Sequence, residues 1–314
     1  MDSARCATRS ETAAGERHDL HPRFGSDDAG HLRTPYLASL LLSGVELIGA
    51  GVALLAAGTL AGFAAGLFGI GGGFVVVPAL FAVLPLLGIA PDEIAHVAIG
   101  TSLATIVATS LRSVQAHARR GAVDFEVLRA WAPWIVGGVG AGVLLASRVP
   151  GDGLALIFGT GVSIMALHFL FPLLGKRQVA AAMPSGAARA GIAGGLGAFS
   201  SLLGIGGGTI AIIVMTLCGK SIHRAIATAA GVGTIIALPG VIGFAAIGWG
   251  ADGLPAGSLG YVNLPAAAVI TSTSILLAPL GAAAAHRLSA GVLGRVFGLY
   301  LLLVGAMMIR NGLT

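Results

Sequence analysis

The chain has 314 residues, of which 56% are hydrophobic, 10% are charged and 50 are glycine, with a formal net charge of +5 at pH 7. Because soluble domains carry about a quarter of charged residues, this composition excludes a soluble enzyme, a coiled coil, a disordered chain and a disulfide scaffold. It predicts a polytopic membrane protein. The basic residues lie between apolar runs, where they orient a protein in the bilayer and do not indicate nucleic-acid binding. Cys6 and Cys218 indicate neither a disulfide framework nor a metal site, and 6% aromatic residues are too few for an outer-membrane barrel.

The N-terminal tail, residues 1–36, mixes charged and small polar residues without apolar periodicity. We therefore expect it to be mostly disordered. It does not resemble a signal peptide, because the first apolar run begins near Leu37 and is too long for the hydrophobic region of one.

After the tail, about ten apolar segments follow one another along the chain. A helix needs about 20 apolar residues to cross a bilayer, so most of these segments are long enough to span it. Two are short, and both follow a cluster of glycines. In chain order the predicted segments are Leu37–Phe68, Gly72–Leu87, Ile94–Leu111, Val127–Ala146, Leu154–Leu174, Ala187–Leu203, Gly207–Cys218, Ala225–Ile247, Val262–Ala285 and Val292–Ile309.

Two motifs recur in the same order and indicate an internal repeat. The sequence G-I-G-G-G at residues 69–73 returns at residues 204–208, an offset of 135. Downstream, the pattern H-x-A-I-x-T at residues 96–101 returns at residues 223–228, an offset of 127. Self-similarity of glycine-rich membrane sequence explains the first match, but it explains the second poorly. The chain therefore divides into a first membrane repeat, residues 37–175, and a second, residues 176–314.

Loops that the repeat pairs with each other carry opposite charge. Because basic loops face the cytoplasm, paired loops are expected on opposite sides of the membrane. This pattern predicts two inverted repeats, an architecture common among secondary transporters, with each glycine cluster forming a broken helix or the apex of a helical hairpin. The loop residues concerned are Arg112, Arg119 and Arg120 against Asp252, and Asp92 and Glu93 against Lys220 and Arg224.

The glycine clusters are the candidate binding site. A non-helical turn at membrane depth is tolerated only inside protein or beside water, and the half-helix that follows it presents free N–H groups and the positive end of its dipole. Such a helix start favours an anion. Neither cluster is followed by the Lys-Ser or Lys-Thr of a nucleotide-binding loop. The predicted substrate-binding residues are Gly69, Gly71, Gly72, Gly73 and Phe74, Gly204, Gly206, Gly207, Gly208 and Thr209, with Thr101, Ser102 and Thr228 as hydroxyl partners.

Two matched histidines, His96 and His223, each precede a paired threonine by five residues. They are interpreted either as structural caps near the membrane interface or as residues with a substrate or proton role.

These motifs resemble the TauE/SafE sulfite exporter family of membrane transporters. The resemblance rests on Gly62 to Pro78, on His96 to Ser102, on the run from Arg119 to Asp124, and on Gly260, Tyr261, Val262 and Pro265. It implies a permease of the bacterial inner membrane for small sulfur-containing anions such as sulfite or sulfonates. The second copy has Ile213 at the position that matches Pro78 and Ala229 at the position that matches Ser102. The two half-sites are therefore expected to contribute unequally.

The resulting hypothesis is an all-α secondary transporter that holds a small oxyanion between two repeats. Its expected partners are the anion and the lipid bilayer, with a homo-oligomer left open and with no cofactor, metal or nucleic acid. A channel or a structural membrane subunit is the first alternative. An intramembrane enzyme is the second, but no H-E-x-x-H or paired-carboxylate spacing supplies catalytic residues for it.

Overall fold

The computed structural model describes residues 33–68, 72–171, 180, 182–285 and 290–313. Most of the predicted tail and two residues of the predicted site, Gly69 and Gly71, lie outside these ranges. The chain forms two compact units, residues 1–44 and 45–314. The first helix, α2 (Arg33–Phe68), crosses this boundary, and its first four residues belong to the predicted tail. The fold below is that of the second unit.

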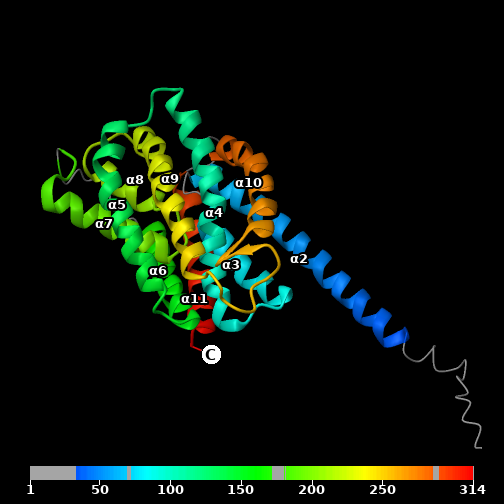
Figure 1. The fold of residues 1–314 in the computed structure, drawn as a ribbon. Coiled ribbons are helices and arrows are strands. Elements are labelled where there is room, and N and C mark those ends of the chain that lie inside the picture. Colours follow the sequence, from blue (N-terminus) through cyan, green and yellow to red (C-terminus); the bar gives the residue numbers. More distant parts are fainter. Residues whose placement is uncertain (1–32, 69–71, 172–179, 181, 286–289, 314) are drawn as a thin grey trace, which may run out of the picture. The chain divides into compact units, whose positions relative to one another are not determined.

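The second unit is built almost entirely of helices (Figure 1). Two short apolar helices, α3 and α8, lie among longer ones, as the sequence predicted. In chain order the elements after α2 are α3 (Gly73–Val83), the 3-10 helix η1 (Leu84–Leu87), α4 (Pro91–Ala118), α5 (Phe125–Ala146), α6 (Gly151–Leu170), α7 (Gly186–Leu202), α8 (Gly208–Leu217), α9 (Ile222–Ile247), β1 (Ser258–Leu259), β2 (Val262–Asn263), α10 (Leu264–Ala285) and α11 (Ala290–Asn311).

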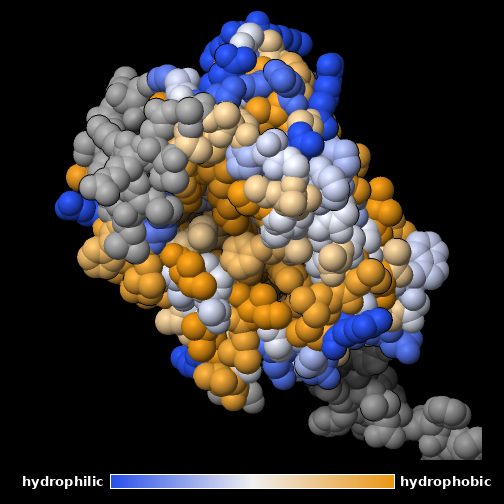
Figure 2. All heavy atoms as spheres, turned by 90° about the vertical axis from the view of Figure 1, so that its left-hand side faces the viewer, coloured by the Kyte–Doolittle hydropathy of each residue, from blue (hydrophilic) through white to orange (hydrophobic). Residues whose placement is uncertain are grey.

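Within the described ranges, six helical stretches are long and apolar enough to cross a membrane. Large apolar side chains are strongly exposed on them, including Ile48 at 69% and Leu276 at 70%. On one face of the unit apolar side chains form a broad band with hydrophilic residues gathered above it (Figure 2). Because such a surface is unfavourable in water and suits lipid, this is a multi-pass membrane protein. The six stretches are Ile48–Gly66, Pro91–Ala118, Phe125–Ala146, Gly151–Leu170, Ile222–Ile247 and Leu264–Gly281.

Two predicted boundaries need correction. α4 continues to Ala118 and so contains Arg112, which the sequence placed in a loop, because a long cationic side chain on a helix can reach the interface without ending the helix. The segment predicted to start as a helix at Val262 begins instead with a two-residue ladder in which Leu259 pairs with Val262. The described fold is therefore all-α apart from this small hairpin, whose pairing depends on the turn at Gly260 with its φ of 53°.

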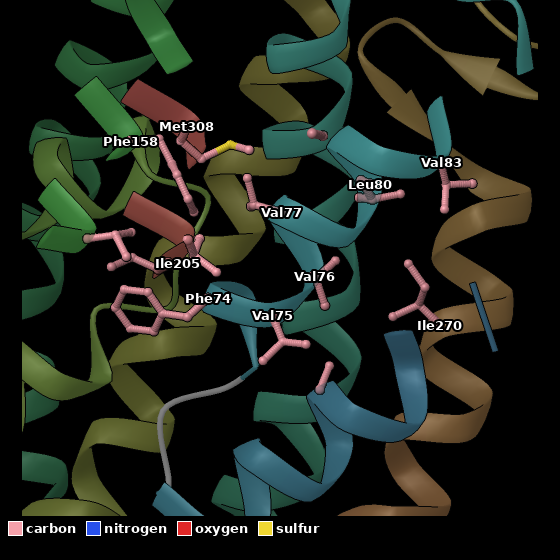
Figure 3. Close-up of a cluster of buried hydrophobic side chains, with 14 of the residues drawn as sticks. Phe74, Val75, Val76, Val77, Leu80, Val83, Phe158, Ile205, Ile270 and Met308 are labelled. Carbon is pink, nitrogen blue, oxygen red and sulfur yellow. The ribbon is translucent and has the colours of Figure 1, made fainter. Parts of the chain in front are cut away.

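Helix α3 lies at the centre of one of the apolar cores (Figure 3). Its Phe74, Val77 and Leu80 are at most 1% exposed. Around α3 lie Phe158 of α6, Met308 of α11 and Ile270 of α10, three helices distant from it in sequence. Pro78 inside α3 cannot donate to the carbonyl of Phe74, and the hydroxyl of Tyr300 donates to that oxygen at 3.4 Å, a weak replacement for the missing bond.

Glycines allow the long helices to approach one another closely. A methyl group built on Gly62 of α2 would lie 2.5 Å from the Cα of Ser274 on α10. The pairs α5 with α7, α6 with α11 and α4 with α9 pack along their lengths. Many glycines of the described helices therefore serve helix packing, as membrane helices commonly require.

Candidate anion site

The connection between α7 and α8, residues 203–207, is non-helical and completely buried. Gly204 has φ 61° and Gly207, the residue that caps α8, has φ 64°. These left-handed conformations favour glycine because a Cβ would be strained in them. The connection therefore lets α8 begin in the interior of the unit, at Gly208.

The start of α3 has the same local form. Its capping residue Gly72 has φ 79°, and Gly73 and Phe74 after it are buried. The start of α3 also contacts the connection that leads to α8, since a methyl group built on Gly73 would lie 2.6 Å from the carbonyl oxygen of Gly204 and 3.1 Å from the Cα of Ile205. Figure 3 shows Ile205 beside Phe74. The structure thus brings together parts of both predicted half-sites, 135 residues apart in sequence.

Two buried hydroxyls at the start of α8 have no hydrogen-bond partner within the described residues. They are Ser200 Oγ, on a residue that is 0% exposed, and Thr209 Oγ1, on a residue that is 6% exposed. Ser200 faces the cap of α8, because a methyl group built on Gly207 would lie 2.8 Å from its Oγ. Thr209 was a predicted site residue. Ser200 was not, although its position shortly before a glycine cluster was a signal that could have identified it.

The sequence predicted the hydroxyls of Thr101, Ser102 and Thr228 as partners of the anion. In the structure each of them forms a hydrogen bond with a backbone group. Ser102 Oγ donates to the carbonyl of Gly204 at 2.8 Å and so holds the 203–207 connection. Thr101 Oγ1 accepts from the N–H of Asn263, and Thr228 Oγ1 accepts from the N–H of Asp124, each at 2.9 Å. All three residues are 0% exposed. Their observed partners make them supports of the backbone around the site.

The two threonines belong to two equivalent junctions between distant segments. In the Asp124 junction, formed by Asp124, Lys220, Arg224 and Thr228, the Asp124 carboxylate caps α5 by accepting from the N–H of Val127. It also accepts from Lys220 Nζ at 2.9 Å and lies 3.5 Å from Arg224 Nε. Burial by itself would raise the pKa of Asp124, but the hydrogen bonds from Lys220 and Val127 and the charges of Lys220 and Arg224 hold that pKa below its usual value.

The second junction, the Asn263 junction, is formed by Asn263, Thr101, Glu93, His96 and Tyr261. Here Asn263 Oδ1 caps α10 by accepting from the N–H of Ala266 at 2.9 Å. The side-chain nitrogen of Asn263, Nδ2, donates to Ser258 Oγ at 3.0 Å and to the carbonyl of Ala256 at 3.4 Å. As in the Asp124 junction, a side chain caps a helix and a threonine accepts from a backbone N–H. Here the partners of the capping side chain are uncharged.

The matched histidines occupy different environments. His96 is 7% exposed, its Nε2 lies 3.0 Å from the carbonyl oxygen of Ala146, and its ring lies 4.8 Å from that of Tyr261. His223 is exposed at the start of α9. The structure therefore brings only His96 into a buried polar group.

The glycine clusters do not line the hollow described next. An open, apolar hollow of about 330 Å³ lies between α6 and α7 and is lined by Ile157, Gly161 and Phe199 among others. Around the starts of α3 and α8 the side chains are packed together. Within the described ranges no group of three His, Cys, Asp or Glu side chains is placed to hold a metal ion.

Comparison with known proteins decides the family. The family described as "Sulfite exporter TauE/SafE" matches residues 54–308, which is most of the chain and includes both glycine clusters. This chain belongs to the TauE/SafE family. The TauE/SafE chain is also 37% identical, over 209 residues, to a "Probable membrane transporter protein" of Haemophilus influenzae, an alignment that covers 66% of this chain and 78% of that protein. No solved structure matches it.

Proposed function

We propose that this protein is a secondary transporter, a permease of the bacterial inner membrane that carries small sulfur-containing oxyanions such as sulfite or organosulfonates. The family description names sulfite export, and the related protein of Haemophilus influenzae is described as a probable transporter. Both descriptions support a carrier. The choice of a sulfur-containing anion comes from the family description, and the chemistry of the glycine clusters supports a small oxyanion.

The start of α8 carries the proposal. The first N–H groups of an α-helix have no partner within the helix, and here they begin at Gly208 and Thr209 in the buried interior. The hydroxyls of Ser200 and Thr209 stand beside them as further donors without a described partner. Donors without acceptors, next to the positive end of a helix, are what a tetrahedral or pyramidal oxyanion with several acceptor oxygens requires.

The start of α3 would complete the site with backbone groups alone. Gly73 touches the 203–207 connection that leads into α8, so the start of α3 lies against the same buried turn. At the positions that the repeat pairs with Ser200 and Thr209, the first half has Ala65 and Phe74. The anion would therefore be held asymmetrically, with hydroxyl contacts from the second repeat and N–H contacts from both.

The proposed transport mechanism is rocking of one inverted repeat against the other around this site. The two junctions support the inverted arrangement because they lie at opposite ends of α5. Asp124 immediately precedes that 22-residue helix, about 33 Å long, and the carbonyl that His96 contacts is that of Ala146, its last residue. Junctions that are equivalent by sequence and far apart along one helix are expected when the halves have opposite orientation.

The test is uptake of radiolabelled sulfite and of an organosulfonate into proteoliposomes that contain the full chain. Removing both hydroxyls with Ser200→Ala and Thr209→Val should lower the apparent affinity at least tenfold, since two hydrogen bonds to a charged ligand contribute about 3 kcal/mol. Thr216→Val is the matched control on the same helix, because the Thr216 hydroxyl already donates to the carbonyl of Ile212 at 2.8 Å. Its transport should stay near the wild-type value.

Saturable flux in the wild type, lost in the double variant and kept in the control, would support the proposal. Wild-type protein that moves neither anion under any imposed gradient would refute the transport function. A double variant with unchanged affinity would refute the site at the start of α8.

A further inference from the structure

A second polar cluster, separate from the glycine clusters, lies where α4 begins, with His96 buried and Glu93 and Tyr261 half-buried. It consists of Glu93 and His96 on α4 and of Tyr261 in the hairpin that precedes α10. The rings of His96 and Tyr261 lie 4.8 Å apart with their planes inclined by 31°. Nothing in the anion site requires these residues, so their burial calls for a separate explanation.

The contacts of His96 determine where its proton lies. Its Nε2 is 3.0 Å from the carbonyl oxygen of Ala146, which can only accept a hydrogen bond, so Nε2 carries the hydrogen. In neutral imidazole the other nitrogen then has a free lone pair. Nδ1 is buried and has no partner within the described residues. His96 can therefore accept a proton at Nδ1 while keeping its bond to Ala146.

Glu93 lies one helical turn before His96 on α4, so the two side chains share a face of the helix. Its Oε2 is buried and also has no partner within the described residues. The Tyr261 hydroxyl hydrogen-bonds to Glu93, and burial, that hydrogen bond and the carboxylate charge raise the pKa of Tyr261 to about 12. Tyr261 thus remains a neutral donor, and the carboxylate of Glu93 is available to balance an imidazolium.

The remaining charged groups at this end of the unit are exposed. They lie on the elements that surround the cluster, namely α4, the turn after α5, α6, the loop after α9 and the end of α11. Solvent screens their effect on a buried group. These residues are Asp92, Arg148, Asp152, Asp252 and Arg310.

The Asp124 junction shows the contrasting design. At the positions that the repeat pairs with Glu93 and Val97 it has Lys220 and Arg224, which neutralise the buried Asp124. Its paired histidine, His223, is exposed. One junction therefore holds a carboxylate paired with two cations, whereas the other holds a carboxyl group and an imidazole without a lysine or arginine at the matching positions.

Helix α4 connects this cluster to the anion site. His96 precedes Ser102 by six residues, about 9 Å along the helix, and Ser102 Oγ donates to the carbonyl of Gly204 in the connection that ends at the start of α8. A negative ligand at the start of α8 and a proton on His96 attract each other through a largely apolar interior, where charges interact more strongly than in water.

We propose that Glu93, His96 and Tyr261 form a proton-binding site, in which His96 Nδ1 takes up a proton when the anion binds, so that the protein carries proton and anion together. The coupling part of this proposal rests on the proposed transport function. The proton enters as H⁺ from one aqueous phase and leaves Nδ1 as H⁺ into the other, and no bond besides N–H forms or breaks.

The coupling test uses proteoliposomes loaded with a pH-sensitive dye and an inward gradient of an organosulfonate, which is fully ionised and brings no proton of its own. The lumen should acidify as the sulfonate enters. His96→Gln keeps an amide that can donate to Ala146 but cannot titrate, and it should lower the ratio of proton flux to sulfonate flux at least tenfold. His223→Gln, the matched control, should keep the wild-type ratio. Sulfonate entry without acidification in the wild type, or an unchanged ratio in His96→Gln, would overturn the coupling.

A second measurement tests the proton site without transport. In protein labelled with nitrogen-15 at histidine, the His96 signal, assigned by its loss in His96→Gln, should show the neutral Nε2–H form and then protonation of Nδ1 as the pH is lowered. If His96→Gln does not fold, assignment through Tyr261→Phe, which perturbs the stacked ring, replaces it. A His96 that stays neutral throughout, or that carries its hydrogen on Nδ1, would overturn the site. Wild type that titrates as expected but moves no sulfonate would count against the proposed function alone.

Discussion

The Asp124 and Asn263 junctions each cap a helix and satisfy a buried backbone N–H, but the capping side chain is charged in the first and neutral in the second. In each, a buried threonine accepts a hydrogen bond from the residue that caps a helix of the other half, at 2.9 Å in both cases. In the Asp124 junction the cap is a carboxylate held by two cations. In the Asn263 junction the cap is an amide held by neutral oxygens, beside a carboxylate and a histidine.

This difference separates what the fold needs from what function adds. Capping α5 or α10 and satisfying one buried N–H stabilise the helix ends and require only an acceptor oxygen. The charges around each cap are not required by that task. Since the same task is completed once with fixed charges and once without them, the titratable groups of the Asn263 junction are free to serve the proton chemistry proposed above.

The largest expected effect comes from neutralising the charged cap. Asp124→Asn keeps an acceptor for the N–H of Val127 but leaves Lys220 and Arg224 without their buried partner. We expect the free energy of unfolding at pH 7 to fall by about 2 kcal/mol, the usual contribution of a charge-assisted hydrogen bond. Reversible unfolding of the detergent-solubilised protein measures it.

The pH dependence of that difference provides its control. Because the pKa of Asp124 is lowered in the folded state, its stabilisation is complete above the ordinary carboxyl value and is lost as pH falls through the lower, folded-state pKa. The difference between wild type and Asp124→Asn should be constant between about pH 5 and 7 and should shrink below about pH 4. A difference that persists unchanged at pH 3 would show that the charge is not its source.

Replacing Thr101 or Thr228 is expected to lower the stability by an intermediate amount, and the loss should be equal in the two junctions. Thr101→Val or Thr228→Val preserves shape but leaves a buried N–H without its acceptor, which costs about 1 to 2 kcal/mol. Thermal unfolding of both single variants and of the double variant measures this, and the two losses should add. Thr101→Ser and Thr228→Ser keep the hydroxyl and should lose far less. Valine variants as stable as the wild type would show that the two hydroxyls do not stabilise these junctions.

The smallest effect should come from making the junctions more alike. Asn263→Asp keeps the cap on Ala266 but replaces the donation to the Ala256 carbonyl by repulsion between that oxygen and the carboxylate, at a cost of about 1 kcal/mol at pH 7. Adding Glu93→Lys supplies the cation that the Asp124 junction has in Lys220 and should restore the loss. Unfolding midpoints at neutral pH test this pair. A double variant less stable than Asn263→Asp alone would show that the two junctions are not interchangeable.

Much of the fold could be predicted from local features of the sequence. The membrane class and the order of long and short helices follow from the lengths of apolar runs, and the family assignment confirms the resemblance seen in the motifs. Gly72 and Gly207 could be singled out because only glycine adopts their left-handed conformation easily, a property of the residue itself. The hairpin at residues 258–263 was missed because two-residue strands leave almost no periodic signal.

The helix starts of the candidate site were predictable, but the hydrogen-bond partners of the hydroxyls near them were not. The glycine clusters identified the helix starts, whereas the role of Ser200 depends on facing Gly207 across a turn, which composition does not reveal. Thr101, Ser102 and Thr228 have the hydroxyls that an anion site uses, but their backbone partners are 162, 102 and 104 residues away in sequence. Residue type alone did not distinguish a hydroxyl that is free to bind an anion from one that bonds to the backbone.

By itself, the sequence determined that this is a helical membrane protein of the TauE/SafE family with two short helices that follow glycine clusters, because apolar length and glycine geometry act within one segment. The tertiary structure alone decided that His96 is buried while His223 is exposed, and that Asp124 and Asn263 cap equivalent helices with different charges. Burial and hydrogen-bond partners arise where distant segments meet, so residues that match in sequence acquire different chemistry from what packs against them.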